Sequence, residues 1–242
     1  MAGHNKWSKI KNKKGKEDAR RAKEFTKLGR AIMVAAKLGG ENPDYNANLK
    51  TAIDKAKSIN MPNDNITRAI KKGVSSADGD NYEEVTYEGY GPGGVALIVE
   101  CLTDNRNRTA PDVRHAFDKF GGNLGTTGSV SFMFEHMGVI LIDASEYDPD
   151  TVMMDALETD IIDAKSEDGI IEVYTTIENF NSVKTFLIEK GYKLFESDIM
   201  YVPSNYQELD GDNKVNMEKL IDMLEENDDV QDVYHNWLED EE

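Results

Sequence analysis

The chain has 242 residues, of which 39% are hydrophobic and 31% charged, so it is long enough for two or three compact domains. Residues 1–80 contain 18 Lys and Arg against 9 Asp and Glu, a formal charge of +9, whereas residues 81–242 contain 10 against 37, a charge of −27. One cysteine excludes a disulfide framework or a Cys-rich zinc module, and no apolar stretch is long enough to cross a bilayer. Since residues 1–7 also lack a secretory signal pattern, we expect a cytoplasmic protein.

The first 16 residues concentrate lysine around one tryptophan. This segment buries too little apolar surface to fold alone, and we expect it to stay mobile until it binds a partner. Clustered lysines bind phosphates of any nucleotide sequence because they release counterions, and Trp7 can stack on an unpaired base. The alternative is a solubilising tail in which Trp7 docks on the next helix. The candidate contacts are Lys6, Trp7, Lys9, Lys11, Lys13, Lys14 and Lys16.

The pattern from Glu17 to Leu38 predicts an amphipathic helix. Apolar residues recur along one side at helical spacing, from Ala22 to Ala36, and cations gather on the other side. Because a solvated face usually mixes charges of both signs, we interpret the cations as a second phosphate contact; the alternative is an ordinary solvated face. They are Arg20, Lys23, Lys27 and Arg30 in one row, with Arg21 beside it.

Two shorter helices are predicted next. Gly39-Gly40 ends the first helix, Pro43 lies at the start of the second, and the apolar stripe of the second runs from Leu49 to Ile59. The third helix is capped by Asn63 or Asp64 and ends before Gly73.

The last turn of that third helix is basic. We assign its cations to stabilising the helix dipole, and interpret residues 75–80 as a linker across which the sign of the charge changes. The cations are Arg68, Lys71 and Lys72.

Beyond the linker, strands alternate with helices. Residues 84–90 and 95–102 predict two strands joined by a glycine-rich turn. Residues 109–120 predict a helix with Pro111 in its first turn, and residues 129–135 predict a further strand.

The loop 103–109 lies between a predicted strand and a predicted helix and contains two of the few basic residues of this half. Arginine side chains at a helix N-terminus suit phosphate or carboxylate binding, so Arg106 and Arg108 are candidate contacts. The alternative is that Asp104 and the neighbouring asparagines cap the helix while both arginines pair with nearby acids.

Residues 139–202 predict the strand and helix order βαββαβ, which is the ferredoxin-like order. A helix over 215–226 and a strand over 230–237 complete the pattern. The simplest arrangement is an α+β protein of three domains: a basic helical domain (1–80), a discontinuous α/β domain (81–136 with 205–242), and an inserted ferredoxin-like domain (137–204). The acidic run at residues 225–229 is interpreted as solvated charge.

No constellation of catalytic residues stands out. The glycines at 89, 91 and 94 match a dinucleotide-binding fingerprint by letter, but a β-type run follows where that fingerprint requires a helix. The four histidines lack metal-ligand spacing, and Cys101 lies within an apolar strand, where burial makes a thiol inert. We therefore expect no catalytic residues, no metal, no cofactor and no small-molecule substrate, and an enzyme is a weak hypothesis.

Several blocks of the sequence form a specific combination: Met1-Ala2-Gly3-His4-Asn5-Lys6-Trp7-Ser8, Tyr87-Glu88-Gly89-Tyr90-Gly91-Pro92-Gly93-Gly94, Asp104-Asn105-Arg106-Asn107-Arg108-Thr109 and Gly121-Gly122-Asn123-Leu124-Gly125. With these blocks the chain resembles the YebC/PmpR family over nearly its whole length. The resemblance implies a bacterial or organellar protein with a helical N-terminal domain and two α/β domains, and no enzymatic activity. Members are described as probable transcriptional regulators that bind DNA, and others, including the mitochondrial translational activator of cytochrome c oxidase, as ribosome-associated translation factors. Gly29 departs from the family, which usually has a large aliphatic residue there.

The leading hypothesis is a non-enzymatic transcriptional regulator that binds DNA through its basic N-terminal domain. The main alternative is a ribosome-associated translation factor that uses the same cations on rRNA, because phosphate contacts carry no sequence information. A third interpretation, an acidic scaffold for basic proteins, predicts that residues 81–242 act alone. No membrane partner is expected. The sequence identifies no target promoter or transcript.

Overall fold

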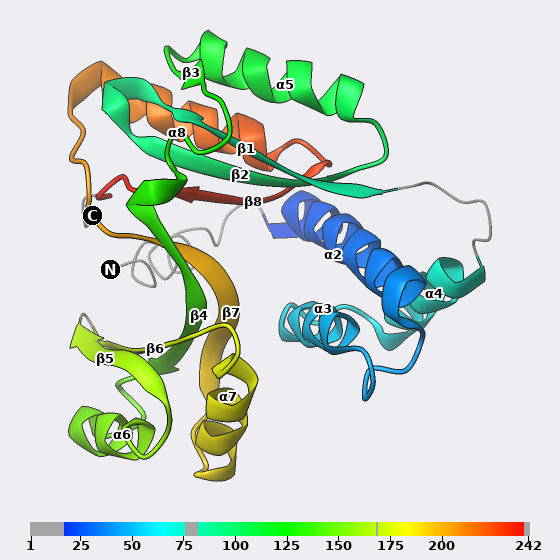
Figure 1. Ribbon diagram of the computed structural model, residues 1–242, viewed down its shortest axis with the longest axis vertical. Helices are drawn as coiled ribbons and strands as arrows, with labels where there is room; N and C mark the ends of the chain where they lie inside the picture. Colours follow the sequence, from blue (N-terminus) through cyan, green and yellow to red (C-terminus); the bar gives the residue numbers. More distant parts are fainter. Residues whose placement is uncertain (1–16, 76–81, 168, 240–242) are drawn as a thin grey trace. The chain divides into compact units, whose positions relative to one another are not determined.

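The computed structural model describes residues 17–75, 82–167 and 169–239, with side chains from Ala22 onwards (Figure 1). Within these ranges the chain forms seven α-helices and two four-stranded β-sheets, which confirms the predicted α+β class. One compact unit comprises residues 17–129 and 210–233, and the other residues 130–209 and 234–239. The three predicted domain boundaries stay a prediction.

The N-terminal helices share one apolar core. α2 (Glu17–Gly39) is contacted by both α3 (Ala47–Ser58) and α4 (Asn63–Ser75), which lie on either side of it in Figure 1. Their predicted apolar stripes meet in this core, because its buried members come from all three helices. They include Ile32 and Ala36 of α2, Leu49, Ile53 and Ala56 of α3, and Ile66 of α4.

Asn46 fixes the turn between α2 and α3. Its side-chain oxygen accepts a hydrogen bond from the Leu49 amide at 3.1 Å, and its side-chain nitrogen donates to the carbonyls of Ala35 at 2.8 Å and Gly40 at 2.9 Å. Gly40 follows α2 with a φ of +86°, the left-handed conformation that glycine adopts readily after a helix. The second helix therefore begins after Asn46, and the predicted start at Pro43 was too early.

α4 continues past the predicted end, through Gly73 to Ser75. A Cβ atom at Gly73 would lie 2.3 Å from the backbone oxygen of Met33, so α4 approaches α2 too closely for any side chain at this position. Gly73 is a packing residue and not a helix terminator, and the predicted end was wrong. Of the three cations assigned to the helix dipole, only Lys72 lies in the last turn.

The first sheet has the strand order β3-β1-β2-β8. β1 (Glu83–Tyr90) and β2 (Ala96–Thr103) are antiparallel and connected through a 3-10 turn (Pro92–Gly94), as predicted. β3 (Asn123–Leu124) pairs with β1, and β8 (Val230–His235) lies on the other edge. α5 (Arg106–Lys119) and α8 (Gly211–Glu225) pack against each other on one side of this sheet (Figure 1).

α5 begins earlier than predicted. The side-chain oxygen of Asn105 accepts a hydrogen bond from the Arg108 amide at 3.2 Å and so caps the helix. The helix consequently starts at Arg106 and not at Thr109, and Arg106 and Arg108 lie in its first turn instead of a loop. Pro111 lies inside the helix, one turn further on than predicted.

The second sheet has the ferredoxin-like order that residues 139–202 predict. Its strands are arranged as β5-β6-β4-β7, and all neighbouring pairs are antiparallel. The apolar residues of two helices pack with those of the strands in one core. In chain order the elements are β4 (Phe134–Asp143), α6 (Pro149–Ala156), β5 (Ile161–Glu167), β6 (Ile170–Thr175), α7 (Phe180–Glu189) and β7 (Leu194–Pro203).

The separate strand predicted over 129–135 was wrong. Ser131–Met133 form a 3-10 turn, and the strand that starts at Phe134 runs without interruption to Asp143. The alternation of side chains at 129–135 therefore reflects a turn followed by the first residues of β4.

Candidate nucleic-acid interface

Three cations of α2 contact other parts of the chain. Lys23, Lys27 and Arg30 point away from the core of the N-terminal helices, as the sequence predicts, but they meet the C-terminal end of α8 and the loop that follows it. The hydrogen bonds run from Lys23 Nζ to the Glu226 carbonyl at 3.3 Å, from Lys27 Nζ to the Glu225 carbonyl at 2.9 Å, and from Arg30 Nη1 to the Asp228 carbonyl at 2.8 Å.

The physical reason lies in the end of α8. The last carbonyl groups of a helix have no partner within the helix, and the helix dipole places partial negative charge there. The three cations of α2 donate hydrogen bonds to carbonyl groups at this end, and their positive charge offsets the partial negative charge there. We call this arrangement, Lys23, Lys27 and Arg30 against residues 225–229, the α2–α8 contact.

Asp229 is the centre of the α2–α8 contact. Its side chain is only 5% exposed, and one carboxylate oxygen accepts a hydrogen bond from Arg30 Nη1 at 2.9 Å. The other oxygen accepts from Arg108 Nη2 at 2.7 Å and from the hydroxyls of Thr109 at 2.8 Å and Thr103 at 3.2 Å. One carboxylate thus joins α2, the end of β2 and the first turn of α5.

The protonation of these groups follows from their surroundings. Burial alone would raise the pKa of Asp229, but the hydrogen bonds from Arg108 and Thr109 outweigh it and lower the pKa below its usual value. Burial lowers the pKa of Lys27, against the opposing effect of Glu225. Arg30 also lies over the ring of Tyr82, 5.4 Å from its centroid, which adds a cation–π contact.

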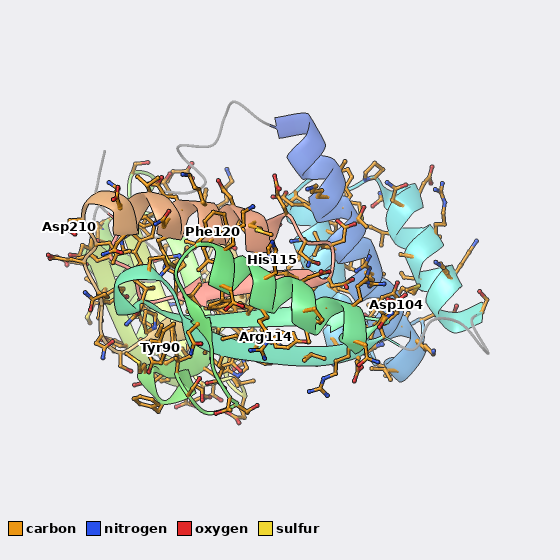
Figure 2. All side chains as sticks on the ribbon, turned by 90° about the horizontal axis from the view of Figure 1, so that it is seen from above. Tyr90, Asp104, Arg114, His115, Phe120 and Asp210 are labelled. Atoms are coloured by element: carbon orange, nitrogen blue, oxygen red, sulfur yellow. The ribbon has the colours of Figure 1, made fainter. Side chains whose placement is uncertain are left out.

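The two arginines at the start of α5 differ in their environment. Arg108 donates to Asp104 at 2.9 Å as well as to Asp229, and Figure 2 shows Asp104 at the end of α5 where the helix begins. Arg106 is exposed. The capping by Asn105 and the pairing of Arg108 agree with the alternative interpretation of this loop.

The structure places the predicted nucleic-acid contacts in different surroundings. Four of them, Lys23, Lys27, Arg30 and Arg108, make hydrogen bonds within the chain, and Arg106 is exposed beside Tyr87. The side chains of Arg20 and Arg21 lie outside the described residues, as does the whole segment with Lys6, Trp7, Lys9, Lys11, Lys13, Lys14 and Lys16.

The acidic run at residues 225–229 is not simply solvated charge, as its composition predicts. Asp229 is buried, and the carbonyl groups of the residues before it receive the cations of α2. No periodicity in the sequence relates residues 23–30 to residues 225–229, which are about two hundred positions apart, so this pairing was missed.

Sequence reasoning also assigned no binding role to several exposed cations of α3 and α4. Lys50 and Lys57 on α3 and Arg68 and Lys71 on α4 form no ion pair with any carboxylate among the described residues. The signal was present as the basic pattern of residues 68–72, which we attributed to the helix dipole because the helix was expected to end before Gly73.

Other kinds of site receive no support from the described residues. Their His, Cys, Asp and Glu side chains form no group of three or more that could hold a metal ion, and their helices are too short or too polar to cross a membrane. Cys101 is buried, and burial raises the pKa of its thiol to about 12, so it stays protonated near neutral pH.

The fold and charges define an α+β protein with a basic, three-helix N-terminal region and a ferredoxin-like unit. The TACO1/YebC protein N-terminal domain matches residues 5–76, and the TACO1/YebC second and third domain matches residues 82–237. The chain belongs to the TACO1/YebC family.

Similar proteins cover almost the whole chain. One from Finegoldia magna is 60% identical over 238 residues, which is 98% of this chain and 99% of that protein, and one from Acetivibrio thermocellus is 54% identical over 239 residues with the same shares. Both are named "Probable transcriptional regulatory protein". The crystal structure of a conserved hypothetical protein from Aquifex aeolicus matches with a TM-score of 0.85 at 45% identity, over 96% of each chain.

Proposed function

We propose that this protein is a non-enzymatic transcriptional regulator that binds DNA through its basic N-terminal region. The observation that carries the proposal is the separation of charge along the chain, +9 over residues 1–80 and −27 over residues 81–242. A cluster of cations binds a polyanion because it releases condensed counterions, and the net negative charge of the remaining residues disfavours nucleic-acid binding over most of their surface. The names of the relatives also support a regulatory role.

The α2–α8 contact bears on which cations make the phosphate contacts. Lys23, Lys27 and Arg30 already satisfy the end of α8, and a phosphate would have to displace the carbonyl oxygens and Asp229. The proposal therefore relies first on Lys6 to Lys16, which lie outside the described residues, with the exposed Arg106 as a further contact. A regulator of this kind acts where the genome and ribosomes are, and we place it in the cytoplasm.

The test is the dependence of DNA affinity on salt concentration, measured by fluorescence anisotropy with a labelled duplex. Six to ten phosphate contacts predict that affinity falls by about 10³–10⁵ between about 50 mM and 200 mM salt. Replacing Lys9, Lys11, Lys13 and Lys14 with alanine should make this dependence shallower. Replacing Lys23 and Lys27 should instead lower stability. A flat salt dependence, or unchanged affinity in the first variant, would refute the proposal.

A ribosomal function predicts the same salt dependence with a different nucleic acid. Sedimentation of a cell lysate after crosslinking separates the two cases, since a transcriptional regulator is recovered with DNA and a translation factor with ribosomal subunits. Recovery only with ribosomal subunits would move the function to translation.

A further inference from the structure

The sheet β5-β6-β4-β7 buries apolar residues on both of its sides. On one side, Ile140, Ile142, Ile171 and Val173 pack with the apolar residues of α6 and α7. On the other side, the described members of the apolar core all come from strands, and we call this side the strand-only face. Its apolar residues are Met137, Val139, Leu141, Ile170, Tyr174 and Met200, with Val202 and Tyr234 beside them.

The strand-only face also contains carboxylates. In the strand register Glu172 of β6 lies beside Leu141 of β4. Asp198 of β7 lies beside Val139 of the same strand. Paired residues point to the same side of a sheet, so both carboxylates share the strand-only face with these apolar residues, and each of the two acidic residues is only 3% exposed. Further carboxylates on this face, on the two edge strands, are Asp163, Glu167 and Glu196.

Two buried carboxylates favour a positively charged neighbour. A carboxylate that is removed from water costs free energy unless hydrogen-bond donors or cations compensate it. Glu172 accepts a hydrogen bond from the Tyr174 hydroxyl, and Asp198 accepts one from the Ile199 amide at 2.8 Å. The ring of Tyr174 contacts a cation, since Lys165 Nζ lies 5.4 Å from its centroid. A ligand of this face should therefore combine positive charge with apolar side chains.

We infer that residues 6–16 of this chain dock on the strand-only face when no nucleic acid is bound. This segment lies outside the described residues and contains six lysines and no acidic residue, with Trp7 and Ile10 as its large apolar residues. Its lysines complement the carboxylates of the face, and its two apolar side chains complement the apolar centre. Extended, it reaches about 36 Å, whereas four strands span about 14 Å, so it is long enough to cross the sheet.

The docking has a consequence for nucleic-acid binding. The lysines that would contact the strand-only face are the same ones that would contact phosphates, so the face and the nucleic acid compete for one segment. This part of the inference rests on the proposed function and adds a form of regulation to it. A nucleic acid that binds strongly releases the segment, whereas a weak polyanion leaves it in place.

The first test is crosslinking of the full chain with a carbodiimide, which joins a lysine amine to a carboxylate in contact with it. An equal mixture of unlabelled and isotope-labelled protein separates, by mass spectrometry, links within one chain from links between two copies. We expect links within one chain from peptides containing Lys6 to Lys16 to Asp163, Glu167 or Glu196. Excess duplex DNA should suppress these links.

The second test is the affinity of the full chain for duplex DNA at a fixed salt concentration. Asp163→Asn/Glu167→Gln removes two charges from exposed positions of the strand-only face. Glu146→Gln/Glu189→Gln is the matched control, because it removes two charges from exposed positions of the same unit, before α6 and at the end of α7. Melting followed by circular dichroism verifies that both variants fold. We expect DNA affinity about two- to tenfold higher in the face variant than in the control, since exposed ion pairs are weak.

The outcomes separate the inference from the proposed function. Links to the strand-only face that disappear with DNA, together with tighter DNA binding by the face variant, support the inference. It is overturned by the absence of these links, by links only between two copies, by links that persist on bound DNA, or by equal DNA affinity of the two variants. None of these results affects the proposed function. A chain that forms the links but binds no DNA overturns the proposed function and leaves the docking alone.

Discussion

Replacing Asp229 with asparagine should destabilise the contacts that join α2, α5 and the end of α8, and so lower the free energy of unfolding. The substitution keeps the size of the side chain and removes its charge, while Arg30 and Arg108 stay in place around it. The neighbouring Asp228 provides a matched control, because it is exposed and contributes its backbone carbonyl to the α2–α8 contact. Asp228→Asn changes the net charge equally and leaves that carbonyl unaltered.

The magnitude follows from the burial of the partners. Arg30 is 17% exposed and Asp229 5%, so their interaction is close to a buried ion pair, for which loss of one partner costs about 3–5 kcal/mol. Arg108 is 48% exposed, and solvent limits its contribution to less than about 1 kcal/mol. Because asparagine still accepts one hydrogen bond, we expect Asp229→Asn to cost about 2–4 kcal/mol and Asp228→Asn less than about 0.5 kcal/mol.

Cys101 provides the assay, because it is the only cysteine of the chain and lies buried in β2 of the same compact unit. Its labelling by a thiol reagent under native conditions measures how often this unit opens. A loss of about 2–4 kcal/mol in the free energy of unfolding predicts that Cys101 is labelled about 30- to 1,000-fold faster in Asp229→Asn than in wild type, at about 1.4 kcal/mol per tenfold change. Equal labelling rates in the two variants would refute the role assigned to Asp229.

The stabilising effect of the Asp229 carboxylate depends on pH in a defined direction. The folded pKa of Asp229 is lowered, so its charge stabilises the fold fully above the unfolded value of about 3.9 and less as pH falls towards the folded value. The stability difference between wild type and Asp229→Asn should be constant above about pH 5 and shrink in stronger acid.

Further predictions concern packing and capping. Gly73→Ala should cost at least about 1–3 kcal/mol in urea unfolding, because its Cβ would meet the Met33 backbone at 2.3 Å; a neutral result would contradict the close approach of α4. Gly29→Ala is the matched control, since a Cβ there meets nothing within 4 Å, and it should stabilise α2 by up to about 1 kcal/mol. Asn46→Ala should cost about 1–2 kcal/mol because three hydrogen bonds of its side chain disappear, and a cost below the error of the measurement would exclude the capping role. In wild type, Cys101 should resist a thiol reagent at pH 8 and react once urea unfolds the protein; immediate reaction would contradict its burial.

The local spacing of apolar residues was sufficient to predict most of the helices and strands. Helical spacing of apolar residues predicted α2 and α3, and the βαββαβ order of residues 139–202 led to the sheet order β5-β6-β4-β7. Some errors were local, such as the Asn105 cap at the start of α5 and the 3-10 turn at Ser131–Met133. The error at Gly73 has a different cause, because the role of this residue depends on a neighbour that is distant in the sequence. Gly73 signalled a helix end, but Met33 across the helix interface determines its role.

The candidate site was less predictable for the same reason. Spacing correctly placed Lys23, Lys27 and Arg30 on one side of α2, but it contains no information about what that side meets. The carbonyl groups at the end of α8 are backbone atoms, and every helix has them, so no side-chain pattern identifies them as the partner. The cations of α4 were recognised in the sequence, but only Lys72 lies in the last turn, because the helix continues to Ser75.

The central claim is that nucleic acid contacts the basic end of this chain. Crosslinking the full-length protein to nucleic acid in living cells, followed by mass spectrometry of the crosslinked peptides, tests it most directly. We predict crosslinks within residues 1–80, including peptides that contain Lys6 to Lys16. Crosslinks confined to residues 81–242 would contradict the account.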